Sequence, residues 1–172
     1  MPFAAVPKCI THRLARRLAL LVLDVDGVLT DGGLWYGPRG ETLKRFHVRD
    51  GHGIKLLRTA GIEVAVVSGR KSAAVRTRCR ELGVKLVMQG VEDKSQALDR
   101  LLQRLSLSDT QVACIGDDTP DVPLFVRVAL AVAVSDAHPL AALAAQCRTT
   151  LPGGHGAVRE VVDWILAARG LP

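Results

Sequence analysis

The chain has 172 residues, of which 48% are hydrophobic, and a formal net charge of +6. This length and composition predict one compact domain, residues 1–172, with a full hydrophobic core. The basic residues are spread along the chain and aromatic residues make up only 3% of it, so no base-stacking surface is indicated and a small anionic substrate accounts for the charge equally well. We therefore expect no nucleic-acid partner.

The N-terminal extension, residues 1–17, is basic and precedes a short apolar run, Leu18–Leu23. This run is too short for the hydrophobic part of a signal peptide and far too short to cross a bilayer, so we expect neither export nor a membrane partner. The cysteines form no C-x-x-C pair, which favours a reducing, cytoplasmic location. They are Cys9, Cys79, Cys114 and Cys147.

Predicted strands and helices alternate along the chain. Apolar runs typical of strands buried on both faces are Leu18–Leu23, Ile62–Val67, Lys85–Met88, Gln111–Ile115 and Leu130–Val134. Stretches with helical spacing of apolar residues are Gly53–Ala60, Ser72–Leu82, Lys94–Leu105 and Pro120–Val128. The alternation predicts an α/β fold, a Rossmann-like parallel sheet with helices on both faces and right-handed crossovers.

Two segments interrupt this pattern. Residues 32–47 contain two short extended runs around the turn cluster Gly37–Gly40, which predicts a β-hairpin flap inserted after the first strand. Residues 151–156 (LPGGHG) are rich in glycine, and we expect a mobile loop there before a last helix, Ala157–Ala168.

Polar residues follow the predicted strands at the edge where ligands of open α/β sheets bind. The first strand is followed by Asp24 and Asp26, the second by Ser68 and Arg70, and the fourth by Asp117 and Asp118, while Lys94 opens the helix after the third. Each residue alone is more often a cap, a turn residue or a solvated lysine. Their joint occurrence at successive strand ends instead predicts a single site.

The chemistry of this predicted site follows from its charges. Asp24 and Asp26 are two residues apart and leave the strand on the same side, and the pair Asp117–Asp118 adds further negative charge. Such a cluster needs a neutralising cation, and ligands that are all oxygen favour Mg²⁺. The hydroxyl of Ser68 and the ammonium of Lys94 are suitable donors to phosphoryl oxygens.

These residues lie in motifs that resemble a known family. The motifs are Asp24–Gly32, Val67–Arg70, Gln89–Gly90 with Lys94, and Gly116–Asp118 with Asp121, supported by Phe46–Gly51, Asp136–Pro139 and Gly153–Glu160. They resemble the minimal-cap subclass of the haloacid dehalogenase (HAD) superfamily, and within it the phosphatases of 3-deoxy-D-manno-octulosonate 8-phosphate. The resemblance runs from about Leu21 to Leu166.

The resemblance implies a magnesium-dependent phosphatase with the HAD fold and a role for each matching residue. Asp24 would be the nucleophile that forms an aspartyl-phosphate, and Asp26 the general acid and base. Ser68 and Lys94 would hold the transferred group. The implied metal ligands are Asp24, the main-chain carbonyl of Asp26, and Asp117, with Asp118 and Asp121 supporting them. The implied substrate-binding residues are Asp26, His47, Val48, Arg49, Asp50, Gly51, Lys55, Arg70, Arg78 and Lys94.

The resemblance also implies the pathway and the assembly. The reaction would be a step in lipopolysaccharide inner-core sugar biosynthesis, and the partner a phosphorylated sugar acid. The hairpin is too short to be a cap domain, so something else must cover the active site. The resemblance implies a homotetramer in which hairpins pack together and a neighbouring subunit, with the tail Gly153–Gly156, screens the site. His47, Lys55 and Thr119–Pro120 depart from the family pattern, which leaves fine specificity open.

The sequence leaves three alternative functions open. A phosphatase for a nine-carbon acidic sugar 9-phosphate shares the hairpin and the first motif, although such enzymes often carry an acid where this chain has Arg70. A phospho-accepting receiver domain carries its acceptor at the end of the third strand, where this chain has no acid in Val87–Gly90. An inactive binding or scaffold protein on the same fold would be expected to lack one of the charged positions, and none is missing.

Overall fold

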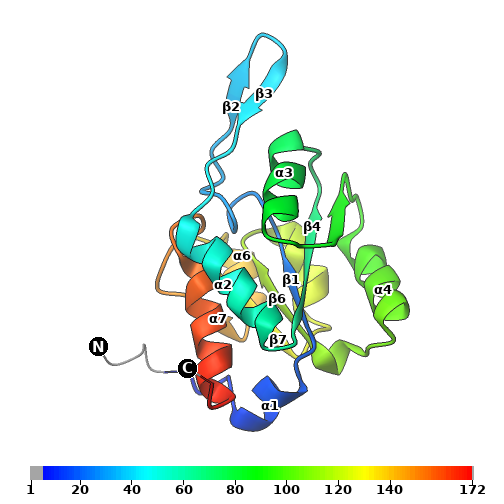
Figure 1. Ribbon diagram of the computed structural model, residues 1–172, viewed down its shortest axis with the longest axis vertical. Coiled ribbons are helices and arrows are strands. Elements are labelled where there is room, and N and C mark those ends of the chain that lie inside the picture. Colours follow the sequence, from blue (N-terminus) through cyan, green and yellow to red (C-terminus); the bar gives the residue numbers. More distant parts are fainter. Residues whose placement is uncertain (1–5, 172) are drawn as a thin grey trace.

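The computed structural model describes residues 6–171. Its centre is a six-stranded parallel sheet with the strand order β5-β4-β1-β6-β7-β8 (Figure 1). The strands are β1 (Leu20–Leu23), β4 (Glu63–Ser68), β5 (Leu86–Gln89), β6 (Val112–Gly116), β7 (Leu130–Ala133) and β8 (Cys147–Arg148). Every residue of β1 is buried, as expected for a central strand covered on both faces.

Helices cover both faces of this sheet. They are α1 (His12–Arg17), α2 (Val48–Thr59), α3 (Ala73–Glu81), α4 (Lys94–Leu105), α5 (Val122–Phe125), α6 (Pro139–Ala144) and α7 (Ala157–Ala168), with 3₁₀ turns η1 (Asp109–Gln111) and η2 (Thr119–Asp121). Leu21 and Leu23 of β1 belong to the core under α1, α2, α3 and α7, whereas Leu20 and Val22 belong to the core under α4, α5 and α6. The predicted fold class is confirmed.

The predicted hairpin is present as a separate two-stranded sheet. Its antiparallel strands are β2 (Trp35–Gly37) and β3 (Gly40–Leu43), and the hairpin projects from the body of the molecule (Figure 1). Apolar side chains remain accessible on it, because Trp35 is 60% and Leu43 64% exposed.

The structure differs from the predicted elements in several places. α2 begins at Val48 rather than Gly53, and its first turn contains Asp50, an acidic residue of the kind that favours a helix N-terminus. Gly53 lets this helix pack closely on α7, since a Cβ on it would lie 3.0 Å from the Cδ of Arg159. The predicted helix Pro120–Val128 is reduced to η2 and the short α5. α1, α6 and β8 were not predicted from the sequence pattern.

The glycine-rich loop at 151–156 was expected to be mobile, and this expectation was wrong. Gly153 and Gly154 are buried. The amide of Gly153 donates to Oδ1 of Asp136 at 2.9 Å, and the amide of Gly154 donates to the carbonyl of Val28, also at 2.9 Å. The loop is therefore packed against the segment that follows β1.

The cysteine argument is also corrected. Cys9 and Cys147 form a disulfide that joins the N-terminal segment to β8, so cysteine usage no longer supports a reducing compartment. Cys79 and Cys114 are free and buried. Within residues 6–171, every helix is too short or too polar to cross a membrane.

Candidate active site

The predicted site residues converge at the carboxyl edge of the sheet. Asp24 follows β1, Ser68 ends β4 and Asp117 follows β6, and these three strands are neighbours in the sheet. Lys94 begins α4 behind them and is only 7% exposed. Its Nζ lies 2.9 Å from Oδ1 of Asp24 and 2.6 Å from Oδ1 of Asp121. The lysine is therefore held by two carboxylates, one of which is the predicted nucleophile.

Three carboxylates form a compact cluster beside this lysine. Oxygens of Asp24, Asp117 and Asp121 all lie within 4.8 Å of one another. Asp121 is already fully engaged, because its Oδ1 binds Lys94 and its Oδ2 accepts the amides of Asp117 at 3.1 Å and Asp118 at 3.4 Å. Asp24 and Asp117 are thus the carboxylates available to a cation, and Asp121 orients the groups around them.

The side chain of Asp118 points elsewhere. It is exposed, and its Oδ1 accepts the amide of Thr119 at 2.6 Å, which caps η2. Asp118 therefore shapes the loop that carries Asp117.

The electrostatics of the cluster fit a divalent cation. Burial, followed by the nearby charges of Asp24 and Asp121, raises the pKa of Asp117 to about 8. Burial also raises the pKa of Asp24, although Lys94 opposes this. Burial would lower the pKa of Lys94, but the two carboxylates beside it outweigh burial and raise it. One ammonium does not neutralise three carboxylates. A divalent cation that prefers oxygen ligands would neutralise the remaining negative charge.

A glycine keeps the loop after β1 close to this cluster. Gly27 has φ +91°, and a Cβ on it would lie 2.1 Å from Oδ2 of Asp117. Only glycine combines that backbone conformation with that close approach. The loop can therefore run directly past the Asp117 carboxylate.

Asp26 and Ser68 occupy different parts of the site. The carboxylate of Asp26 is outside the cluster; it forms an ion pair with Lys44, and its Oδ2 lies 3.7 Å from Nε of Arg70. Ser68 is buried and its Oγ accepts the amide of Arg70 at 3.2 Å. The Asp26 side chain thus faces the hairpin and Arg70, whereas Asp24 faces Lys94.

Part of the predicted substrate-binding set has a structural role. The carboxylate of Asp50 is 1% exposed and accepts the amides of Gly156 at 3.2 Å and Arg159 at 2.8 Å, at the start of α7. The Asp50 carboxylate is thus engaged within the chain, and the assignment of Asp50 to the substrate stays a prediction. Gly51 makes room for Arg78, since a Cβ there would lie 2.3 Å from the Nη2 of that arginine. Arg78 in turn pairs with Glu81 at 3.2 Å.

The other predicted substrate residues are dispersed. Val48 is 75% exposed, Arg49 lines a groove with Thr150 and Asp163, and Lys55 lines another with Arg80. His47 has a buried Nδ1 that forms no hydrogen bond within residues 6–171. In one chain these four residues do not join the carboxylate cluster, and their assignment stays a prediction.

Three residues of the hairpin segment lie at the site although the sequence motifs did not predict them there. Oε2 of Glu41 lies 3.2 Å from both Nζ of Lys44 and Nη2 of Arg70, and the hydroxyl of Tyr36 lies 3.0 Å from Nη2 of Arg70. The hydrogen bonds that Arg70 donates to Tyr36 and then to Glu41 raise the pKa of Arg70. The residues around Lys44 in the sequence do not distinguish it from the basic residues beside it. The way the hairpin folds back onto the site brings Lys44, and not its neighbours, to Asp26 and Glu41.

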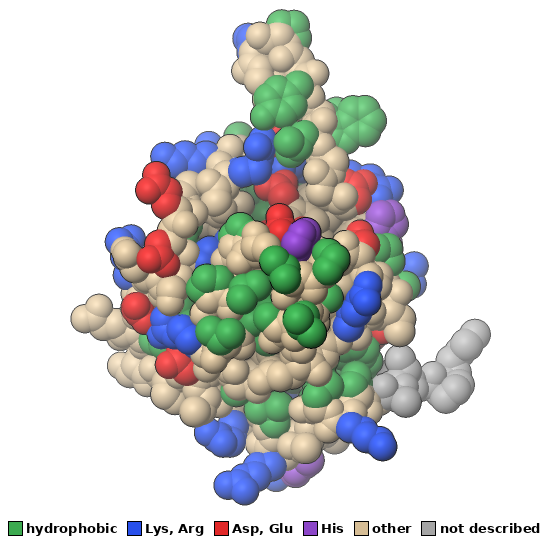
Figure 2. Space-filling view, turned by 180° about the vertical axis from the view of Figure 1, so that it is seen from behind, with side chains coloured by type: hydrophobic (Ala, Val, Ile, Leu, Met, Phe, Trp, Pro, Cys, Tyr) green, Lys and Arg blue, Asp and Glu red, His purple; other side chains and the backbone are tan. Residues whose placement is uncertain are grey.

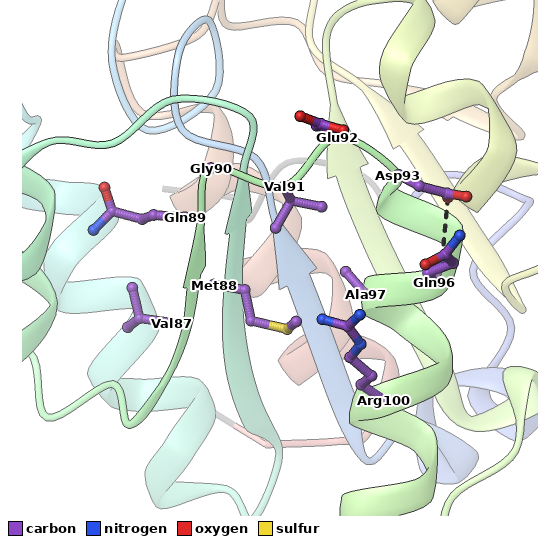
Figure 3. A pocket seen from close by; sticks show the side chains of 10 residues that line it. All are labelled: Val87, Met88, Gln89, Gly90, Val91, Glu92, Asp93, Gln96, Ala97 and Arg100. Atoms are coloured by element: carbon purple, nitrogen blue, oxygen red, sulfur yellow. Dashed lines mark hydrogen bonds between the residues drawn. The ribbon is translucent and has the colours of Figure 1, made fainter.

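A hollow of about 530 Å³ lies next to the start of α4 (Figure 3). Its walls come from β5, the loop after it and α4, and include Gln89, Glu92 and Arg100. None of the clustered carboxylates lines it. The hollow is therefore separate from the catalytic cluster.

Comparisons with known proteins agree with this geometry. Residues 87–160 match the model of haloacid dehalogenase-like hydrolases. The chain is 48% identical, over 91% of its length and 83% of the relative's, to 3-deoxy-D-manno-octulosonate 8-phosphate phosphatase KdsC of Escherichia coli (strain K12).

Solved structures show the same relationship. The crystal structure of 3-deoxy-D-manno-octulosonate 8-phosphate phosphatase from Yersinia pestis is 44% identical with a TM-score of 0.93, covering 99% of this chain and 91% of the other. The enzyme of that name from Moraxella catarrhalis, in complex with magnesium ion, phosphate ion and KDO, is 37% identical with a TM-score of 0.89, covering 92% and 91%. The chain therefore belongs to the 3-deoxy-D-manno-octulosonate 8-phosphate phosphatase family of haloacid dehalogenase-like hydrolases.

Proposed function

We propose that this protein hydrolyses 3-deoxy-D-manno-octulosonate 8-phosphate to the free sugar acid and inorganic phosphate, as a step in lipopolysaccharide inner-core sugar biosynthesis. The observation that carries the proposal is the convergence of Asp24, Asp117 and Lys94 at one edge of the sheet. The membership of the chain in a phosphatase family supports it. The enzyme is a phosphoric monoester hydrolase.

The residues divide the reaction between them. An Asp24 oxygen attacks phosphorus, the bond from phosphorus to the ester oxygen breaks, and an aspartyl-phosphate forms. Asp26 gives a proton to the leaving alcohol oxygen and then takes one from the water that hydrolyses the aspartyl-phosphate. Lys94 and the Ser68 hydroxyl hold the transferred phosphoryl oxygens, and Asp121 fixes Lys94 in place.

Magnesium would be held by Asp24, Asp117 and the main-chain carbonyl of Asp26. When bound, it supplies positive charge for the phosphoryl oxygens and neutralises the carboxylates. The arrangement of the described residues fits this role, because Asp24 and Asp117 present oxygens to one small volume and Asp121 has none to spare.

Magnesium should stabilise the folded protein measurably. A ligand that binds only the folded state adds about 2.7 kcal/mol at a concentration one hundred times its Kd. We expect Mg²⁺ to raise the melting temperature of the wild type and of Asp163→Asn, whose carboxylate pairs with Arg159 on α7. Asp117→Asn should lose most of this increase. A thermal scan with and without EDTA measures the effect, and an equal increase in Asp117→Asn would contradict the ligand assignment.

The sugar carboxylate is assigned to Arg70. Its side chain is 40% exposed and lies beside Asp26. Its Nη2 already donates to Tyr36 and Glu41 and its Nε is buried, so the sugar carboxylate would bind the remaining terminal nitrogen, Nη1, by a charged hydrogen bond. This arginine also separates the proposal from the nine-carbon alternative, in which an acid is common at the same position.

Kinetics with three substrates test this assignment. We expect kcat/KM to fall in the order octulosonate 8-phosphate, nine-carbon sugar-acid 9-phosphate, neutral hexose phosphate. Arg70→Ala should remove most of the preference, because a hydrogen bond to a charged group contributes about 1.5–3 kcal/mol. Equal efficiency with the hexose phosphate would show that the substrate is wrong, while a preference for the nine-carbon ester would favour the alternative.

We also propose that the enzyme is a homotetramer in which hairpins pack together and neighbouring subunits cover the active sites. The hairpin exposes Leu34, Trp35, Tyr36 and Leu43, and Figure 2 shows hydrophobic side chains along this projection. Sedimentation should give four times the chain mass of 18.4 kDa, and Trp35→Asp should shift it toward monomer with loss of activity. A fully active wild-type monomer would refute shared active sites.

A cytoplasmic location remains part of the proposal.

A further inference from the structure

The side chain of Lys44 is buried beside Asp26 of the proposed active site. This side chain is only 1% exposed, and its ammonium forms ion pairs with Asp26 and, at 3.2 Å, with Glu41. Burying an ammonium is costly unless carboxylates compensate it. Two carboxylates do so here, and one of them is the proposed general acid and base. The residue is therefore integrated into the site.

The hairpin carries this lysine to the site. Lys44 directly follows β3, and Glu41 within β3 connects it to Arg70. Arg70 also donates a hydrogen bond to the hydroxyl of Tyr36, on the opposite strand. Ion pairs and hydrogen bonds thus connect Tyr36, Glu41 and Lys44 of the hairpin segment to Asp26 and Arg70 of the site.

The contacts of Asp26 show which way its carboxylate is held. Oδ1 faces Lys44, and Oδ2 faces Nε of Arg70 at 3.7 Å. Repulsion from the carboxylates around Asp24 would act in the same direction, away from the phosphoryl site. Arg70 is the residue to which the proposed function assigns the sugar carboxylate. The acid therefore lies on the side where the sugar, and with it the leaving oxygen, would bind.

We propose that Lys44 is a positioning residue that holds the Asp26 carboxylate toward the leaving oxygen of the substrate. This inference rests on the proposed function, since it takes Asp26 as the general acid. A general acid acts only within hydrogen-bond reach of the atom it protonates. Without Lys44, only the longer contact of 3.7 Å with Nε of Arg70 remains to orient the carboxylate. The hairpin then contributes to catalysis within its own chain, in addition to any contact between subunits.

The test compares two leaving groups. The value of kcat/KM reports steps up to the departure of the alcohol, and a sugar alkoxide needs a proton whereas 4-nitrophenolate leaves without one. In Lys44→Met we expect kcat/KM to fall about 10²-fold or more for the sugar phosphate and only a few-fold for 4-nitrophenyl phosphate. Asp26→Asn should show the same selectivity, and Lys44→Arg should recover part of the loss.

Lys85→Met is the matched control. Lys85 is exposed just before β5, outside the hairpin, and forms no ion pair among residues 6–171, so the variant makes the same chemical change without touching Asp26. Its kcat/KM should equal that of the wild type with both substrates. An equal loss with both substrates in Lys44→Met would overturn the proposal in favour of a phosphate ligand or a structural role, and so would no loss at all.

A crystal structure of Lys44→Met gives a readout independent of activity. We expect the Asp26 carboxylate to turn away from its wild-type direction, and an unchanged direction would overturn the proposal. A failure of the proposed function can be distinguished from a failure of this inference. If the octulosonate ester is a poor substrate of the wild type, the substrate assignment is wrong, and the role of Lys44 is then tested with whichever alkyl phosphate the wild type hydrolyses best.

Discussion

Asp24→Asn should abolish turnover while leaving the fold intact. Asparagine keeps the size of the side chain but is not a nucleophile, and loss of a nucleophile costs at least about 10⁴-fold in kcat. The neighbouring Lys94 keeps its 2.6 Å contact with Asp121, so the buried ammonium is not left alone. The melting temperature should therefore remain close to that of the wild type.

Phosphate release from the octulosonate ester measures this prediction. Asp99→Asn is a suitable control, because it makes the same chemical change on the exposed side of α4, where Asp99 pairs with Arg127. It should retain wild-type turnover. Hydrolysis by Asp24→Asn within about ten-fold of the wild type would exclude Asp24 as the nucleophile, because loss of a nucleophile costs far more.

The core of the candidate site was predictable because it depends on strand ends. Apolar runs locate the strands, and parallel strands bring the residues that follow them to one edge. Asp24, Ser68 and Asp117 meet for this reason. Lys94 was predictable on the same ground, since the helix it opens follows the neighbouring strand β5.

The remaining features depend on distant contacts that no local pattern encodes. Lys44 reaches Asp26 only because the hairpin folds back toward the loop after β1. Asp50 was assigned to substrate, but its carboxylate caps the start of α7, 106 residues away in the sequence. Composition likewise cannot show that Cys9 meets Cys147 across 138 residues. In each case the residue type permits several roles, and tertiary packing selects one.

The glycine-rich loop gives the largest expected effect on stability. A Cβ on Gly153 would lie 1.7 Å from the carbonyl oxygen and 2.4 Å from the carbonyl carbon of Gly27. These are backbone atoms, so no flexible side chain can move aside. The hydrogen bond from the amide of Gly154 to the carbonyl of Val28 holds the two loops together at this point. Gly153→Ala must therefore displace the loop after β1 or the glycine-rich loop itself.

We expect Gly153→Ala to lose about 3 kcal/mol or more of its free energy of unfolding, at the upper end of overpacking effects. For a chain of this size the melting temperature should fall by roughly 6 °C or more. Gly69→Ala is the control for adding the same methyl group, because the nearest atom to its Cβ, the carbonyl oxygen of Val91, would lie 3.5 Å away; its stability should change far less.

Gly153→Ala also tests whether the glycine-rich loop packs against its own chain or against a neighbouring subunit. Gly27 follows Asp26, so the fraction of Gly153→Ala that folds should lose activity even where its melting temperature is still above the assay temperature. Because the contact lies within one chain, the loss of stability should not depend on protein concentration, as a contact between subunits would. A melting temperature equal to that of the wild type would show that the loop does not pack against the catalytic segment, and would restore the expectation that it moves freely.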